Sequence, residues 1–174
     1  MRSIVIYNSK TGFTEKYAHW IAEKIGCEAI GYKHMTAEQW KNRDVIIYGG
    51  GIMAGMIAGW DKIKSNPAAE GKRMILFAVG ATQPEETEMI ETVKNKNLTE
   101  EEQKRIPFFY FEGGINYERM GLITKMMLKL MYKSLKGKKD RTPEETGMMR
   151  IFEKSFDHSK EEYIIPLAEC AEKL

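Results

Sequence analysis

Short apolar runs alternate with amphipathic stretches along the chain. Four runs rich in β-branched or aromatic residues predict strands that are buried on both faces of a parallel sheet. These runs cover residues 4–7, 45–48, 74–79 and 108–111, and a shorter strand is expected over 27–32. Helical spacing follows the first run, at Tyr17, Ile21 and Ile25, and similar segments separate the later runs. Alternating strands and helices predict an α/β domain with a parallel sheet.

Helix starts are indicated where a Ser or Thr is followed three residues later by Glu or Gln, the spacing of a capping box. This spacing occurs at Thr36, Thr82, Thr99, Thr142 and Ser159. A further helix is expected near residues 56–64. Pro166 is expected to kink or interrupt the last helix, because proline lacks the backbone N–H group that a helix interior needs.

Small and polar residues follow the predicted strands. The segments after the four long runs are residues 9–14, 49–55, 80–84 and 113–114, and each contains glycine or hydroxyl side chains. Turns need some glycine, so any one of these segments has a structural explanation. Parallel strands end at one edge of their sheet, however, and ligands bind beyond that edge. Together the segments predict a binding site there.

The first of these segments has the composition of a phosphate-binding loop. It reads Ser9-Lys10-Thr11-Gly12-Phe13-Thr14 and lies between a predicted strand and a predicted helix. A helix N-terminus presents free backbone N–H groups and the positive end of the helix dipole, and nearby hydroxyls add donors. Gly12 allows close approach of the backbone. An ordinary polar turn that caps its helix is the alternative on local grounds.

The composition excludes several other classes of protein. The 174 residues are 43% hydrophobic, which suits one globular domain, and the formal net charge of +2 gives no reason to expect nucleic acid as a partner. Cys27, Cys170 and three scattered histidines lack metal-ligand spacing, so no metal site is expected. The N-terminus lacks the pattern of a signal peptide, which favours the cytoplasm. No side chain stands out as an acid or base, and the catalytic residues stay unknown.

A long segment, roughly residues 113–156, separates the last apolar run from the final helix. Within it, residues 120–135 predict a helix whose lysines, Lys125, Lys129 and Lys133, form a narrow polar stripe. Its broad apolar face carries Leu122, Ile123, Met126, Met127, Leu130 and Met131. The face either packs on the domain or meets a membrane, a lipophilic substrate or a partner chain.

The loop of residues 9–14 resembles the S/T-x-T-G-x-T phosphate loop of the flavodoxin superfamily. That resemblance implies a flavodoxin-like, doubly wound α/β sandwich over residues 1–174 as a single domain. Its parallel sheet would have five strands in the order 2-1-3-4-5, helices on both faces and a helical insert before the last helix. The cofactor would be FMN.

Three groups of residues would hold FMN if the resemblance holds. Ser9, Lys10, Thr11, Gly12, Phe13 and Thr14 would bind its phosphate. Gly50, Gly51, Ile52, Met53, Ala54 and Gly55 would flank one face of the flavin ring, and Gly80, Ala81, Thr82 and Gln83 would border its other side and its pyrimidine end. Electron-shuttling flavodoxins place aromatic residues in these loops and are strongly acidic. In this chain the two ring loops contain no aromatic residue, and the formal net charge is +2.

The layout of the insert is similar to that of the flavodoxin-like protoporphyrinogen oxidase (dehydrogenase) family. The shared pattern is a glycine-then-tyrosine segment, Gly113 to Tyr117, followed by a Met/Lys-rich helix. It implies an FMN-dependent oxidoreductase for a bulky apolar or quinone-linked substrate, similar to protoporphyrinogen. The electron acceptor would be a quinone or a redox partner protein, and helix 120–135 would contact a lipophilic substrate or the membrane periphery.

Two other functions remain open at this stage. One is a flavodoxin-type carrier that passes single electrons between protein partners. The other is a non-redox site for a different phosphate compound, although neither G-x-x-x-x-G-K-[ST] nor G-x-G-x-x-G follows the first strand. A homodimer is also left open.

Overall fold

The computed structural model describes residues 2–140 and 155–174. Its centre is a sheet in which the parallel strands follow the order β2-β1-β3-β5-β6. The strands are β1 (Ser3–Asn8), β2 (Glu28–Gly31), β3 (Val45–Met53), β5 (Arg73–Gly80) and β6 (Phe108–Glu112). Counted as parallel strands alone, this order is 2-1-3-4-5, so the prediction of the sheet is confirmed.

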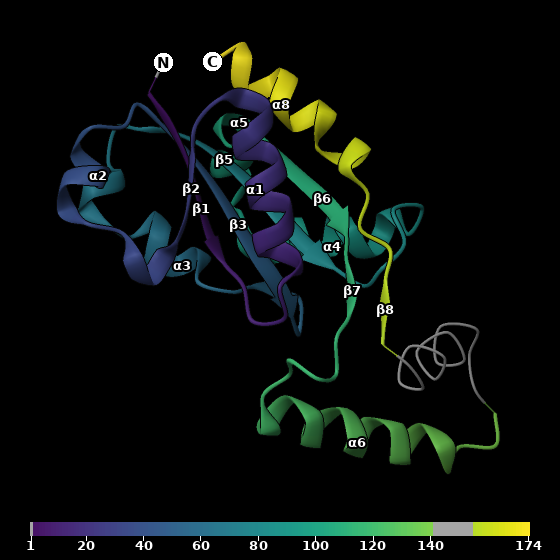
Figure 1. Cartoon of the computed structure of the whole chain (residues 1–174). Helices are drawn as coiled ribbons and strands as arrows, with labels where there is room; N and C mark the ends of the chain where they lie inside the picture. Colours follow the sequence, from purple (N-terminus) through teal and green to yellow (C-terminus); the bar gives the residue numbers. More distant parts are fainter. Residues whose placement is uncertain (1, 141–154) are drawn as a thin grey trace.

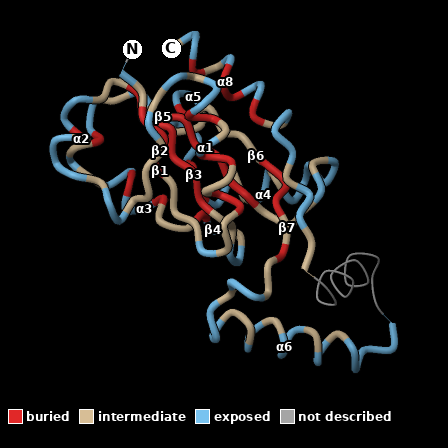
Figure 2. Tube along the Cα trace, viewed as in Figure 1, coloured by how far each residue is buried: buried red, intermediate tan, exposed pale blue. Residues whose placement is uncertain are grey.

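Helices cover both faces of the sheet (Figure 1). One face packs on α1 (Phe13–Ile25) and α8 (Ile165–Glu172). The other packs on residues of α2 (Ala37–Lys41), α3 (Trp60–Lys64), α4 (Thr87–Asn97) and the short turns beside α5 (Glu100–Arg105). Along β1 the faces alternate: Val5 belongs to the first core, and Ile4 and Ile6 belong to the second. The buried residues concentrate between these layers (Figure 2).

The capping boxes predicted at Thr36 and Thr99 are both present, with reciprocal bonds to Gln39 and Glu102. The helix start predicted at Thr82 is wrong, because α4 begins at Thr87. The residue before a proline is driven out of the helical region, and Gln83 precedes Pro84. Residues 80–84 therefore remain an irregular loop at the end of β5.

Residues 50–55 are ordered differently from the loop expected after the third strand. β3 continues to Met53 and turns back into β4 (Met56–Ile57), so the helix expected near 56–64 is reduced to α3. Ala54 and Gly55 form the turn with φ values of 53° and 81°. Positive φ at both turn residues matches the twist of a two-residue hairpin, which explains why the chain reverses here.

Short 3-10 turns complete the chain: η1 (Tyr32–His34), η2 (Pro67–Ala69) and η3 (Glu161–Ile164). The helix predicted to start at Ser159 begins only at Ile165, because the Ser159 hydroxyl bonds to Asp157 instead of capping. Pro166 does not kink that helix; it occupies the first turn, where its missing N–H group costs nothing. The helix predicted at Thr142 lies outside the described residues.

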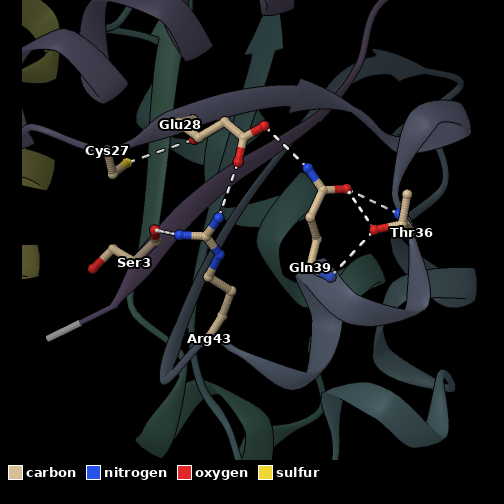
Figure 3. Close-up of polar contacts among 6 residues, drawn as sticks. All are labelled: Ser3, Cys27, Glu28, Thr36, Gln39 and Arg43. Atoms are coloured by element: carbon tan, nitrogen blue, oxygen red, sulfur yellow. Dashed lines mark hydrogen bonds and ion pairs between the residues drawn. The ribbon is translucent and has the colours of Figure 1, made fainter.

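A polar network holds the edge strand β2 to the amino end of the sheet (Figure 3). Glu28 is its centre. Arg43 donates from Nη2 to Glu28 Oε2 at 2.9 Å, and Gln39 donates from Nε2 to Glu28 Oε1 at 3.0 Å. Arg43 also reaches the Ser3 carbonyl on β1, which links two neighbouring strands through one side chain. This network lies at the end of the sheet opposite to the predicted site.

The insert stands apart from the α/β body. Strands β7 (Gly114–Ile115) and β8 (Phe156–Asp157) pair antiparallel at its base, and α6 (Leu122–Lys136) lies beyond them (Figure 1). No residue of α6 is buried, and Leu122 and Ile123 are 85% and 73% exposed. Its apolar face is therefore not packed on the domain. None of the helices in the described ranges has the length and hydropathy needed to cross a bilayer.

Candidate functional site

The loop of residues 9–14 has the geometry of an anion-binding loop. The Gly12 N–H group donates to Ser9 Oγ at 3.1 Å, and Gly12 adopts a φ of +99°, which side chains rarely tolerate. No side chain caps α1. Among the described groups, the N–H groups of its first turn therefore remain available to an anion, at the positive end of the helix dipole. These groups lie at the end of β1, where the phosphate loop is predicted.

The predicted loops after β3 and β5 meet this loop at one edge of the sheet. A Cβ on Gly51 would stand 3.6 Å from Thr14 Oγ1, and a Cβ on Gly80 would stand 3.1 Å from Ile52 Cδ1. The three segments therefore line a continuous edge, in the order of their strands. They come together because β1, β3 and β5 are adjacent and parallel.

Two glycines of β3 serve packing. A Cβ on Gly49 would stand 1.9 Å from the Phe77 ring, and one on Gly50 would stand 2.6 Å from Ile57 Cγ2. Both distances are too short for any side chain. Gly50 is thus needed by the hairpin of β3 and β4, whereas Gly51 faces the loop of residues 9–14.

An aromatic residue that the sequence did not single out fixes the loop after β5. Tyr110 on β6 donates its hydroxyl to the Thr82 carbonyl at 2.7 Å, and a Cβ on Gly80 would lie 2.9 Å from the same hydroxyl. Burial raises the pKa of Tyr110 well above its ordinary value, so the phenol stays protonated and remains a donor. The sequence did not indicate this role, because Tyr110 lies within an apolar run that predicts a buried strand.

The insert places a cation, Arg119, beside the candidate site, and the sequence did not indicate this contact. The Nη1 atom of Arg119 lies 2.9 Å from the position of a Cβ on Gly12. Asn116 Oδ1 accepts a bond from the Arg119 backbone N–H group at 3.1 Å, which shapes the turn before α6. Residues far apart in sequence meet here, and no local pattern indicates the contact.

A cavity of about 540 Å³ opens beside the loop after β5. Gln83 to Glu85 line one side, residues 157–160 line another, and Glu112 lies at the end of β6. Glu112 is only 6% exposed, and its Oε1 atom is 2.8 Å from His158 Nδ1. This imidazole–carboxylate pair can hold or move a proton, but neither residue was predicted. A charged residue directly after an apolar run was the available signal.

Lys16 ties the returning chain to α1 beside this cavity. Its Nζ atom donates to Asp157 Oδ2 at 2.9 Å and to Ser159 Oγ at 2.8 Å. Burial opposes ionisation of Asp157, but hydrogen bonds from Ser159 and Lys16 outweigh it and lower the pKa of the carboxyl. Tyr17 adds a bond from its hydroxyl to the Glu112 carbonyl. The base of the insert is therefore anchored to the helix that follows the candidate phosphate loop.

Cys27 and Cys170 are free and partly buried rather than fully buried. Within the described ranges, no three His, Cys, Asp or Glu side chains stand close enough to hold a metal ion.

The fold and this edge define a class of protein: a doubly wound α/β protein with an anion-binding loop at the carboxyl ends of its strands. The chain belongs to the flavodoxin domain family, whose model, described as "Flavodoxin domain", matches residues 4–142. It is an FMN-binding protein with a redox function. The open N–H groups, the hydroxyls and the positive φ of Gly12 fit the phosphate of that cofactor.

The solved structures that this chain resembles have low sequence identity to it. A flavodoxin from the domain Archaea is 16% identical, with 65% of this chain and 85% of that chain covered and a TM-score of 0.45. The Trp repressor binding protein from Bacillus subtilis is 18% identical, with 80% and 99% covered and a TM-score of 0.45. Flavodoxin 2 from Bacillus cereus is 19% identical, with 63% and 84% covered and a TM-score of 0.40. No curated protein matches the chain.

Proposed function

We propose that this protein is an FMN-dependent oxidoreductase for a bulky apolar or quinone-linked substrate, similar to protoporphyrinogen. The observation that carries the proposal is the apolar face of α6. Six side chains that an ordinary domain would bury are exposed on one helix next to the cofactor edge: Leu122, Ile123, Met126, Met127, Leu130 and Met131. Exposed apolar patches of this kind mark surfaces that bind apolar partners.

The cofactor site in this proposal uses the three predicted segments. Ser9, Thr11, Gly12 and Thr14 would bind the phosphate, with Lys10 and Phe13 in the same loop. Residues 50–55 and 80–83 would bracket the flavin ring. Bound FMN supplies reversible two-electron or one-electron transfer. The chain itself would bind the cofactor, orient its ring and exclude water from its apolar side through Ile52.

The charge of α6 supports contact with a membrane in which such substrates dissolve. The helix contains four lysines and no acidic residue, and Lys129, Lys133 and Lys136 are exposed. A basic amphipathic helix lies in the interface of anionic bilayers, where apolar side chains and lysines both gain contacts. Peripheral attachment at the cytoplasmic face of a membrane follows, and a homodimer through the same face is the competing outcome.

Association with vesicles tests the role of α6. Vesicles that contain anionic lipid should retain the protein during sedimentation at low salt, and light scattering should show a monomer in their absence. A stable dimer that ignores vesicles would assign the face to self-association instead.

Turnover assays test the oxidoreductase. The FMN-loaded protein should be reduced by protoporphyrinogen and reoxidised by a menaquinone analogue. If neither a porphyrinogen nor a quinol reduces the bound flavin, the proposed substrate class is wrong.

The second candidate is a carrier of single electrons between proteins. A reductive titration separates the two, because a carrier should accumulate the one-electron-reduced form of its flavin. A direct passage from oxidised to fully reduced flavin would favour the oxidoreductase. The small net charge of +2 disfavours the carrier, since steering toward a basic redox partner requires an acidic surface.

A further inference from the structure

A guanidinium group from the insert lies against the candidate phosphate loop. Arg119 belongs to the turn between β7 and α6, and its Nη1 and Cζ atoms lie 2.9 Å and 3.9 Å from the position of a Cβ on Gly12. Gly12 has no Cβ, so the guanidinium can approach the backbone closely. Apart from the chain neighbours Thr11 and Phe13, no other residue of the described ranges comes within 4 Å of that position.

The surroundings of this guanidinium are electropositive. It lies beside the N-terminus of α1, where open N–H groups and the helix dipole already concentrate positive potential. Glu15 in the first turn of α1 accepts a bond from Tyr7 at 2.9 Å, and Asp157 accepts one from Lys16 at 2.9 Å. Among the described residues, no carboxylate pairs with the Arg119 guanidinium. A cation at a helix N-terminus is unfavourable unless an anion lies between them.

Arginine is also the side chain whose shape suits a phosphate. Its planar fork presents two parallel N–H donors to two phosphate oxygens, whereas a lysine presents a point charge on a flexible stem. The loop has a lysine of its own, Lys10. Both Lys10 and Arg119 are exposed, but only Arg119 lies against the position of a Cβ on Gly12. Arg119 and Lys10 are therefore rival sources of the neutralising charge, and the position of Arg119 favours it.

We propose that Arg119 binds the phosphate of FMN and that residues 116–121 act as a clasp over the loop of residues 9–14. The proposal rests on the proposed function, because it takes residues 9–14 as the phosphate site. It makes the insert part of the cofactor site, so that the turn leading into α6 is held in place by FMN. A specificity for FMN over riboflavin follows, since riboflavin lacks the phosphate.

Flavin affinity measured by fluorescence quenching tests the clasp. Arg119→Gln should weaken FMN binding about 10- to 100-fold at low salt, which is the range of one or two charge-assisted hydrogen bonds. Riboflavin binding should stay within about twofold of the parent, because that ligand lacks the group that Arg119 contacts. Arg119→Lys should lose less than Arg119→Gln, since it keeps the charge without the fork. Lys10→Gln should lose less FMN affinity than Arg119→Gln. Arg105→Gln, at an exposed arginine that ends α5, is the matched control and should leave the FMN affinity unchanged.

Each other result counts against the clasp. If Arg119→Gln binds FMN as tightly as the parent, or loses riboflavin to the same extent, Arg119 has no role or only a structural one. A larger loss for Lys10→Gln would transfer the charge role to Lys10. A parent protein that binds neither flavin would overturn the proposed cofactor site itself. If the parent binds FMN and Arg119→Gln binds it equally well, only the clasp is overturned.

Discussion

Helices α1 and α6 have similar lengths, 13 and 15 residues, and both are amphipathic, but they do different things with their apolar faces. α1 buries Tyr17, Ala18, Ile21 and Ala22 against the sheet, whereas α6 buries none of its residues. An amphipathic pattern thus establishes that a helix has an apolar face, but not what covers that face. In this protein one face stabilises the fold and the other is available to a partner.

The largest expected effect is the loss of FMN affinity when the glycine before α1 is substituted. Gly12→Val should abolish FMN binding, with a loss of more than about 100-fold, because a β-branched residue is strained at a φ of +99° and its Cβ would meet Arg119. Isothermal titration with FMN checks this. Gly137→Ala, at the end of α6 with a φ of −76° and no atom closer than 3.7 Å to an added Cβ, is the control and should leave the affinity unchanged. A Gly12→Val protein that binds FMN normally would remove the loop from the site.

Truncating one apolar residue on each helix measures the difference in burial directly. Ile21→Ala should lower the free energy of unfolding by about 2–5 kcal/mol, because it removes a fully buried side chain from the core of α1. Leu130→Ala, at a position 63% exposed on α6, should change it by less than about 0.5 kcal/mol. Urea unfolding followed by circular dichroism gives both values. Equal losses would mean that α6 packs on the domain after all.

A charge on the face of α6 tests what the exposed side chains are for. Leu130→Lys should reduce association with anionic vesicles about tenfold or more, since it removes an apolar contact of about 1.5–3 kcal/mol from the interface. Met89→Lys, at an exposed methionine on α4, is the matched control and should have no such effect. Sedimentation with vesicles at a fixed salt concentration measures both. Undiminished binding by Leu130→Lys would exclude α6 from the membrane contact.

The smallest expected effect concerns the access of water to the thiol of Cys27, which follows α1. Cys27 follows α1 and packs against its core, and burial raises the pKa of its thiol to about 11. Alkylation of a Cys170→Ser protein by iodoacetamide should therefore be slow at pH 8 and reach half its maximal rate near pH 11. Because the pKa of the thiol is higher in the folded state, its protonated form favours folding below about pH 9, and this contribution is lost as the pH rises through about 11. Half-maximal alkylation near pH 9 would show that the thiol is open to water.

Local chemistry in the sequence predicted the parallel strands and the two capping boxes that the structure shows, whereas the order of the strands followed from the resemblance to the flavodoxin superfamily. Runs of buried residues and the S/T-x-T-G-x-T spacing are each short, so a few neighbouring residues carry the whole signal. The local rules were wrong where a neighbour overrode them. Pro84 prevents a helix from Thr82, Ala54 and Gly55 make a hairpin where a loop was expected, and Ser159 bonds to Asp157.

The sequence by itself therefore predicted a phosphate loop at residues 9–14 and an amphipathic helix in the insert, and the structure contains that helix as α6. Only the tertiary structure decided that Arg119 lies over Gly12, that Glu112 meets His158, and that the apolar face of α6 stays exposed. Those contacts join residues that are distant along the chain, and they depend on how β7 and β8 bring the insert back to the sheet edge. No local preference encodes such an approach, because its energy comes from packing and charge in three dimensions.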